Sequence, residues 1–244
     1  MHPNAYLEMA NTEARHWWFV GRRAILTSVI SNMTLQQSAR ILEIGAGTGG
    51  NLSMLSRFGS VSALETDATA RSIAKAKTDG RVDIRAGLCP NDIPFPPQSF
   101  DLVCLLDVLE HIEDDVPTLM ACKKLLASSG RLLLTVPAYS WLWSAHDEFL
   151  HHKRRYHVPD LRVKLAKAGL HIDRISFFNT LLFPLVALGR LKDRFLKRPL
   201  ATGADVPIAL INHFLSNIFG AERLLLRTCD LPFGVSLLVI CSAE

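Results

Sequence analysis

The sequence predicts an α/β protein built on a doubly wound, mostly parallel sheet. From residue 39 onward, short runs of β-type residues alternate with segments of helical periodicity, which is the pattern of strands joined by crossover helices. A glycine-rich turn, Gly45-Ala-Gly-Thr-Gly-Gly50, follows the first of these runs. The chain has 244 residues, enough for one such domain with an elaboration, so we expect a single core.

A helical leader is predicted before the first strand, over residues 1–36, because apolar residues recur there at helical spacing. The leader contains three consecutive aromatic residues, Trp17, Trp18 and Phe19. Two interpretations stay open for them. They form a lid on an active site, or they pack the leader onto the domain.

The parallel strands are predicted at five β-type runs, 40–44, 61–65, 82–85, 100–106 and 131–136. Helices are predicted between or after them, near 48–58, 68–77, 115–127 and 158–169. In such a sheet, ligands bind beyond the carboxyl ends of the strands, where the strand order reverses. Residues directly after each run are therefore the candidate site residues.

The predicted domain comprises residues 37–244. Its last part is predicted to contain a strand at 170–176, a helical insertion at 177–233 and a final antiparallel strand at 235–241. Residues 177–228 carry seven basic and three acidic residues, a net charge of +4 that equals that of the whole chain. This basic and apolar segment suggests anionic lipid headgroups or an acidic, greasy substrate; a solvated helix face is the alternative.

Composition excludes several classes of protein. Hydrophobic residues make up 49% of the chain, but no apolar run approaches the ~20 residues of a membrane helix, and no secretory signal is recognised. Five cysteines without a C-x-x-C pair indicate reduced thiols in the cytoplasm. Basic residues are interleaved with apolar runs, so no nucleic-acid partner is expected.

The glycine-rich turn is typical of a nucleotide site. Gly45 and Gly47 allow a sharp turn and a close approach of ligand to backbone. With Gly50 they satisfy G-x-G-x-x-G, which leaves a dinucleotide site, a nucleoside site and a structural turn open. Glu65 ends the second strand about twenty residues later, where a carboxylate can accept two hydrogen bonds from a ribose diol.

The segment 139–157 is the densest in functional groups. They are Tyr139, Trp141, Trp143, His146, Asp147, Glu148, His151, His152, Lys153, Arg154, Arg155, Tyr156 and His157. The interspersed cations argue against a metal site within the segment. Arginines suit a phosphate or carboxylate and tryptophans an apolar partner, so substrate recognition is predicted, with a surface loop as the alternative.

Five motifs together resemble the class I S-adenosylmethionine-dependent methyltransferases, in particular the bacterial small-molecule group that includes the ubiquinone-pathway O-methyltransferases. The motifs are Ile41-Leu-Glu-Ile-Gly-Ala-Gly-Thr-Gly49, Leu64-Glu65, Ile93-Pro-Phe-Pro-Pro-Gln-Ser-Phe-Asp-Leu-Val103, Leu106-Asp-Val-Leu-Glu-His-Ile112 and Gly130-Arg-Leu-Leu-Leu-Thr-Val-Pro137. The resemblance implies a Rossmann-like methyltransferase fold, S-adenosylmethionine as cofactor and S-adenosylhomocysteine as product.

The resemblance also implies which residues hold the cofactor. The first turn would surround its methionine end, Glu65 its ribose, and the backbone near Gly87 its adenine. The expected cofactor-binding residues are Glu43, Gly45, Ala46, Gly47, Glu65, Thr66, Gly87, Leu88 and Asp107. Many relatives bind the adenine amino group with an acid in the loop corresponding to 87–92. Here Asn91 or Asp92 must take that role, or the contact is lost.

A helical turn after the fourth strand would place Asp107, Glu110 and His111 on one face, because they are spaced i, i+3, i+4. In the ubiquinone-type enzymes, an acid, an acid and a histidine at matching positions hold a divalent ion. Asp107 replaces the first glutamate here, and its shorter arm places the metal in doubt. His111 as a base or substrate orienter and a structural cap are the other interpretations.

The predicted function is methyl transfer to a small, apolar or lipid-linked acceptor, with oxygen as the expected atom. His111 is the first candidate for general base, followed by His146 and His151, because a near-neutral imidazole suits that task. Candidate substrate-binding residues are Trp17, Trp18, Tyr139, Trp143, Arg154 and Arg155.

Two alternative functions stay open. A nicotinamide-dependent oxidoreductase would use the same glycines and Glu65, and a non-catalytic S-adenosylmethionine-binding protein would bind cofactor without methyl transfer. We expect a cytoplasmic protein, with contact to the inner membrane surface through residues 177–228. The sequence does not predict an oligomeric state.

Overall fold

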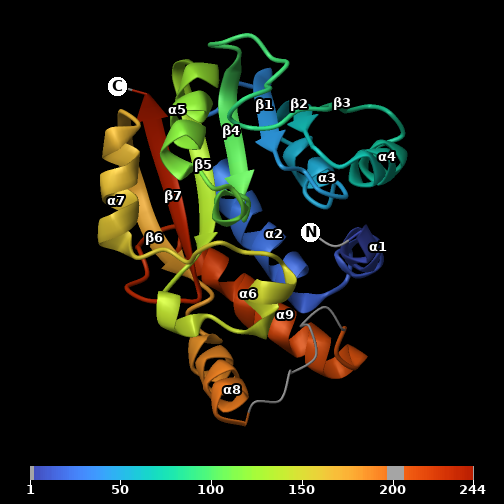
Figure 1. Cartoon of the computed structure of the whole chain (residues 1–244), viewed down its shortest axis with the longest axis vertical. Coiled ribbons are helices and arrows are strands. Elements are labelled where there is room, and N and C mark those ends of the chain that lie inside the picture. Colours follow the sequence, from blue (N-terminus) through green and yellow to red (C-terminus); the bar gives the residue numbers. More distant parts are fainter. Residues whose placement is uncertain (1–2, 197–205, 244) are drawn as a thin grey trace.

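The structure, a computed structural model, describes residues 3–196 and 206–243 and contains a seven-stranded mixed sheet (Figure 1). The strands are β1 (Ala39–Ile44), β2 (Gly59–Leu64), β3 (Asp83–Arg85), β4 (Phe100–Leu106), β5 (Leu126–Pro137), β6 (Leu170–Phe178) and β7 (Ser236–Ala243). Their order is β3-β2-β1-β4-β5-β7-β6. β1 to β5 are parallel, and β7 is antiparallel to β5 and β6. The predicted fold class is confirmed.

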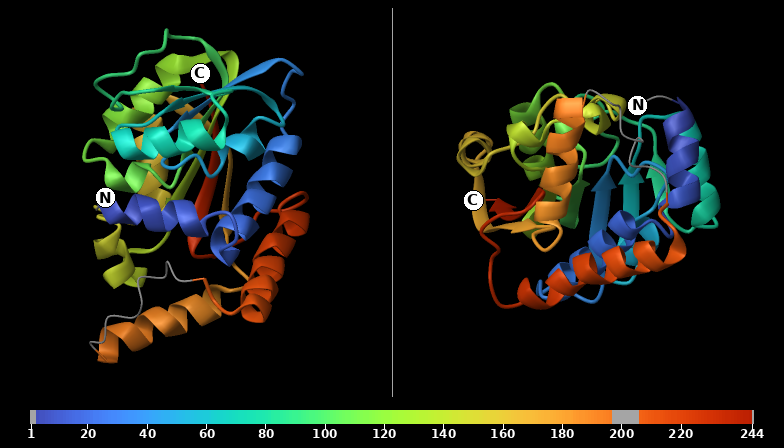
Figure 2. Two further views of the ribbon diagram at one scale, coloured as in Figure 1. Left: turned by 90° about the vertical axis from the view of Figure 1, so that its right-hand side faces the viewer. Right: turned by 90° about the horizontal axis from the view of Figure 1, so that it is seen from below.

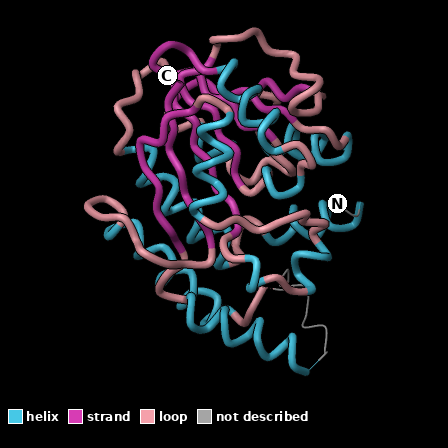
Figure 3. The backbone as a smooth tube through the Cα atoms, turned by 60° about the vertical axis from the view of Figure 1, so that its left-hand side comes forward, coloured by secondary structure: helices cyan, strands magenta, loops and turns pink. Residues whose placement is uncertain are grey.

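Helices cover both faces of this sheet (Figures 1 and 3). They are α1 (Pro3–Thr12), α2 (Trp17–Ser31), α3 (Leu52–Leu55), α4 (Ala68–Lys77), α5 (Asp115–Leu125), α6 (Ala145–Phe149), α7 (Val158–Lys167), α8 (Phe183–Leu196) and α9 (Ala209–Leu225), with short 3₁₀ turns η1 (Leu109–His111) and η2 (Ser140–Leu142). Because side chains alternate along a strand, Ile41 of β1 packs with α2 and α9 while Leu42 packs with α5 and α7. Two apolar cores result, one on each face.

Two element boundaries differ from the sequence prediction by four residues or more. α3 begins at Leu52 instead of residue 48, because the glycine turn continues through Gly49, whose φ of +84° is outside the helical region. β5 begins at Leu126 instead of residue 131, because Leu126 pairs with Phe100 before the register shifts and pairing resumes at Arg131.

The leader lies across the carboxyl ends of the central strands. α1 packs against α4, and α2 packs along α9, so the N-terminal and C-terminal parts of the chain lie side by side (Figure 2). Trp18 stacks on Phe219 with ring centroids 5.1 Å apart, and Phe219 in turn stacks on Phe178. The leader aromatics therefore pack against the core, as one of the two interpretations proposed.

The helical insertion consists of α8 and α9. Part of the predicted basic segment, including Lys197, Arg198, Pro199 and Gly203, lies outside the described residues. Within the described part, four leucines along α8 and the turn before it are at least 38% exposed, namely Leu181, Leu185, Leu188 and Leu191. None of the helices in residues 3–196 and 206–243 has the length and apolar character needed to cross a membrane.

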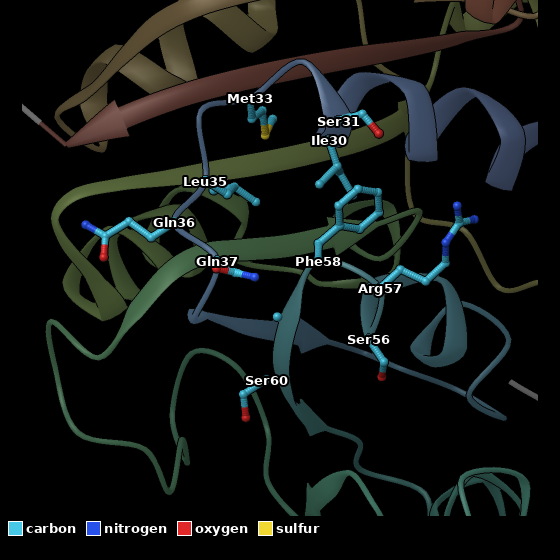
Figure 4. Close-up of a pocket in the computed structure, with 11 residues that line it drawn as sticks. Ile30, Ser31, Met33, Leu35, Gln36, Gln37, Ser56, Arg57, Phe58 and Ser60 are labelled. Atoms are coloured by element: carbon cyan, nitrogen blue, oxygen red, sulfur yellow. The ribbon is translucent and has the colours of Figure 1, made fainter.

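A surface hollow of about 610 Å³ lies at the amino ends of β1 and β2 (Figure 4). It is lined by the end of α2, the segment before β1 and the residues after α3, including Met33, Leu35 and Phe58. Ligands of doubly wound sheets bind at the carboxyl ends of the strands. The hollow is therefore at the wrong edge of the sheet for the cofactor.

Candidate active site

A cavity of about 710 Å³ lies at the carboxyl ends of β1, β2 and β4, where the strand order reverses between β1 and β4. Its walls come from the leader, the glycine turn, the segment after β4, the loop with α6, and α8. The volume is within the usual range for small-ligand sites. The candidate residues that follow separate strands in the sequence thus share one space.

The glycine turn closes one end of the cavity. The Gly45 amide donates to the Leu64 carbonyl over 2.8 Å, which holds the turn against the end of β2. Gly45 has φ +72°, and a Cβ there would lie 2.7 Å from the Val108 side chain. Only glycine suits this position, because both the backbone conformation and the space are restricted.

Glu65 organises the turn from β2. One carboxylate oxygen accepts the Gly47 amide over 2.7 Å, and the other accepts the Asp67 amide over 2.9 Å. A carboxylate offers about four acceptor positions, so Glu65 retains capacity for the hydroxyls of a ribose. Thr66, Gly87 and Leu88 line the cavity beside it. Asn91 and Asp92 are exposed and lie outside the lining, so an adenine contact from either side chain stays a prediction.

The leader covers this end of the cavity. The Thr48 hydroxyl donates to the buried Glu13 carboxylate over 2.8 Å, and Lys77 of α4 pairs with the same carboxylate. A Cβ at Gly50 would clash with Glu13. Tyr6 also lines the cavity, where burial and the nearby carboxylates of Glu65 and Asp67 raise its pKa to about 12.

A polar chain lies behind the turn. The Asn51 amide donates to Glu43 over 2.7 Å, and Arg22 of α2 contacts Asn51 and forms an ion pair with Asp107. The Thr135 hydroxyl donates to the other oxygen of Asp107 over 3.0 Å. Asp107 lines the cavity. Glu43 is 1% exposed and is not part of the lining, so it supports the turn from behind.

Burial dominates the electrostatics of Glu43. Removal from water raises its pKa to about 7, although the hydrogen bond from Asn51 and the charge of Arg22 oppose the shift.

Two imidazoles meet beside the segment after β4. η1 presents Glu110 and His111, and the rings of His111 and His152 lie 4.7 Å apart in a T-shaped arrangement. Burial, together with the neighbouring His152, lowers the pKa of His111 to about 4. His111 is therefore neutral at pH 7, but it is a weaker base than an unperturbed imidazole.

Asp147 anchors the loop that carries His152. It is fully buried and accepts hydrogen bonds from His152 Nδ1 over 2.9 Å, from Arg155 over 2.8 and 3.0 Å, and from Arg190 of α8 over 2.9 Å. Burial alone would raise the pKa of Asp147, but these donors hold it well below the usual range. The network joins the loop to the insertion.

The structure separates the predicted site residues into two groups. Those lining the cavity are Trp17, Trp18, Gly45, Ala46, Gly47, Glu65, Thr66, Gly87, Leu88, Asp107, Glu110, His111, His146 and Arg155. Those outside the lining are Glu43, Tyr139, Trp143, His151 and Arg154. Tyr139 stacks on Phe177, and Arg154 donates to Asp115, so both hold the loop to the domain.

Sequence reasoning did not select four residues that shape the site, namely Glu13, Arg22, Asp147 and His152. Their partners are between 5 and 85 residues away. Only the H-D-E motif with two later histidines, in the loop 146–152, was visible as a signal, and it could not show which histidine faces the cavity.

The resemblance implied a divalent ion at Asp107, Glu110 and His111. Both oxygens of Asp107 are engaged by Arg22 and Thr135. Glu110 and His111 instead approach His152, with one possible ligand atom from each lying within 4.8 Å of the others. A cation fits this second set of donors better than the first.

A family model described as a methyltransferase domain matches residues 15–180, which is more than half of the chain. The chain belongs to this methyltransferase family. Membership, together with the strand order, confirms the recognition of an S-adenosylmethionine-dependent methyltransferase domain from its sequence motifs.

Individual relatives agree with this assignment. The ubiquinone biosynthesis O-methyltransferase of Xanthomonas euvesicatoria is 28% identical over an alignment of 155 residues, and the match covers 57% of this methyltransferase and 65% of the relative. The match thus spans less than two thirds of the relative's length.

Solved structures share the fold. One is a chain of the complex between the Haloferax volcanii Trm112 methyltransferase activator and a methyltransferase, with a TM-score of 0.65, 18% identity and coverage of 99% of this chain and 95% of that one. Another is the Haemonchus contortus phosphoethanolamine N-methyltransferase 2 in complex with S-adenosyl-L-methionine, with a TM-score of 0.58, 18% identity and coverage of 90% and 52%. At these identities the likeness is one of fold.

Proposed function

We propose that this methyltransferase transfers the methyl group of S-adenosylmethionine to an oxygen atom of a small, apolar or lipid-linked acceptor. The observation that carries the proposal is the continuity of the cavity. One end has the glycine turn and Glu65, which suit a nucleoside, and the other has apolar side chains from three separate elements, Trp18, Phe149 and Val186. The similarity to a ubiquinone biosynthesis O-methyltransferase supports oxygen as the acceptor atom.

The roles of the residues follow from simple chemistry. The sulfonium is already a strong electrophile, so the protein has to hold the acceptor in line with the methyl group and to accept a proton. Glu65 and the Gly47 amide would bind the ribose and methionine ends. His111 and His146 line the cavity and are the candidates to receive the acceptor's proton.

The direct test combines calorimetry with product analysis. We expect S-adenosylmethionine, and not NAD, to bind to the full chain, and labelled methyl to appear in a metabolite or lipid fraction of the host. Glu65→Gln should weaken S-adenosylmethionine binding at least ~10-fold, because the amide cannot accept from both backbone N–H groups and a ribose diol. The exposed Glu148→Gln is the matched control.

Each other outcome favours a specific rival. Binding of NAD alone would select a nicotinamide oxidoreductase. Binding of S-adenosylmethionine without transfer to any acceptor pool would select a non-catalytic binding protein.

We also propose that α8 rests on an anionic membrane surface. One side of α8 lines the cavity through Val186 and Gly189, whereas Leu185 and Leu188 are 59% and 66% exposed. The surrounding segment carries the chain's net positive charge. An apolar row beside basic residues suits a lipid surface with anionic headgroups, and it would bring the cavity close to a lipid-linked acceptor.

A further inference from the structure

Glu110 is the side chain whose surroundings most need an explanation. It is fully buried, and neither carboxylate oxygen has a hydrogen-bond partner among the described residues. Neither Arg22 nor Arg155 donates to these oxygens, because their hydrogen bonds go to Asp107 and Asp147. A buried carboxylate without partners is costly, and a bound cation is one recognised reason for retaining such a group.

Two imidazoles converge on the same point. His111 follows Glu110 in η1, and the backbone bond from the Lys153 amide to the Glu110 carbonyl, 2.8 Å long, brings the neighbouring His152 to it. Ligand atoms of Glu110, His111 and His152 all lie within 4.8 Å of one another. Atoms bound to one ion at ~2.0–2.2 Å lie at most ~4.4 Å apart, so the three side chains need at most a small approach toward one another to share an ion.

His152 is held by a hydrogen bond to the Asp147 carboxylate, as metal-binding histidines often are. Asp147 also accepts hydrogen bonds from Arg155 and Arg190, so it is the acceptor of the 2.9 Å bond and Nδ1 of His152 is the donor. Nε2 then keeps its lone pair. A carboxylate behind a histidine in this way fixes the tautomer and direction of many metal ligands.

We propose that Glu110, His111 and His152 form a divalent-cation site on the wall of the cavity. The third ligand is His152 from the loop after β5, and Asp107 is not a ligand because Arg22 and Thr135 engage its oxygens. All three ligands line the cavity, so the remaining coordination positions face the space expected for the acceptor.

The donor set selects the class of ion. Two imidazole nitrogens and one carboxylate oxygen suit Zn²⁺, Co²⁺, Mn²⁺ or Fe²⁺, whereas Mg²⁺ prefers oxygen ligands. The site therefore differs from an oxygen-rich magnesium site in both its third ligand and its ion. The inference concerns ion binding alone and does not depend on the proposed acceptor. With an ion bound, His111 serves as a ligand, and His146 is the remaining candidate to receive the acceptor's proton.

Ion binding can be measured on the full chain without any acceptor. After treatment with a chelator, the protein should bind one Co²⁺ or Zn²⁺ in calorimetry, at least ~10-fold more tightly than Mg²⁺. His152→Gln and Glu110→Gln should each weaken Co²⁺ binding at least ~100-fold. His151→Gln is the matched control, because its imidazole is adjacent in sequence but exposed and outside the cavity lining.

Two further variants keep the result clear. Asp107→Asn should change Co²⁺ affinity less than ~3-fold. His152→Cys should produce a thiolate-to-cobalt charge-transfer band, which a merely structural role of residue 152 would not produce. The proposal is overturned if Co²⁺ and Zn²⁺ do not bind, or if Asp107→Asn abolishes binding while folded His152→Gln binds as the wild type does.

Discussion

Glu43 is a carboxyl group that the fold places in the core on the α2 side of β1. The strand alternation puts it on the same face as Ile41, and Asn51 is the only described side chain that hydrogen-bonds it. The resemblance implied contact with the cofactor, but the side chain lies behind the turn. In this position it accepts the Asn51 amide, and Asn51 in turn contacts Arg22; contact of Glu43 with the cofactor stays a prediction.

This burial predicts a pH dependence of stability. Glu43 has a pKa near 4.5 when unfolded and about 7 when folded, so between these values the folded state binds a proton that the unfolded chain has lost. The carboxyl group therefore lowers the free energy of unfolding as pH rises from 4.5 to 7, by about 3 kcal/mol in total. Glu43→Gln resembles the protonated form and should gain stability over the wild type across this window.

Urea unfolding of the cofactor-free protein at pH 5, 6, 7 and 8 measures the difference directly. Glu148→Gln, an exposed glutamate on α6, is the control for a change of charge. A wild-type to Glu43→Gln difference that stays constant from pH 5 to pH 8 would show that Glu43 ionises normally in the folded protein.

Individual site residues differ in how visible they are in the sequence. Gly45, Gly47 and Glu65 could be selected because their roles depend on backbone conformation and on position after a strand. Arg22 and Glu13 could not, since a charged residue in a leader has no local signal that its partner lies after β4 or in the glycine turn. Long-range pairing is set by packing, which a single sequence does not reveal.

At the scale of elements, the loop between β5 and α7 is held by one acid. Asp147 takes donors from His152 and Arg155 within the loop and from Arg190 of α8. Sequence reasoning assigned Arg155 to substrate binding because arginine suits anions. The structure shows the anion it binds to be Asp147; a role in substrate binding stays a prediction.

The sequence also predicted strand boundaries well where they depend on local residue patterns, and poorly where they depend on long-range pairing. Strands β1, β2 and β4 were predicted within two residues, because buried parallel strands are short apolar runs. The start of β5 was missed by five residues, because it depends on pairing of Leu126 with Phe100.

The exposed row of α8 gives a prediction about lipid binding. Leu185→Gln combined with Leu188→Gln should reduce binding to vesicles containing phosphatidylglycerol at least ~10-fold, because two leucines no longer enter the apolar boundary. Gln is a good helix former and both positions are exposed, so the fold should be unaffected. Cosedimentation with vesicles measures the bound fraction.

A matched pair of changes elsewhere separates this effect from general surface apolarity. Met120→Gln with Val163→Gln alters two exposed apolar side chains on α5 and α7 and should leave vesicle binding unchanged. Equal binding by the α8 variant and the wild type would exclude α8 as the contact. Reversal of Arg190 is unsuitable as a test, since it would break the ion pair with Asp147.

At the scale of the whole molecule, the leader helix α2, which lines the cavity, is held in place by α9 near the other end of the chain. α9 packs on α2, and Asn212 of α9 accepts the Trp17 amide over 2.8 Å, so the insertion fixes the position of the leader. Trp17 and Trp18 both pack on the core and line the cavity. The structure shows the packing that the sequence offered as one alternative; a lid function stays a prediction.

α1 is the part of the leader that should respond to cofactor. It contributes Tyr6 and Met9 to the cavity, and Glu13 just after it is bound to Thr48 in the glycine turn and to Lys77. A ligand beneath α1 adds contacts on one side of a helix that packs mainly on α4. Local opening of α1 should therefore become rarer when the site is filled.

Hydrogen exchange followed by mass spectrometry tests this expectation. Amides in residues 6–16 should exchange at least ~10-fold more slowly with S-adenosylhomocysteine bound, while those of α7, which does not line the cavity, should not change. Glu13→Gln should accelerate exchange of the same segment in the free protein, because the ion pair with Lys77 is lost. If the ligand slows exchange in the glycine turn but not in residues 6–16, α1 does not cover the cofactor, and the cavity is closed by α2 and α8 alone.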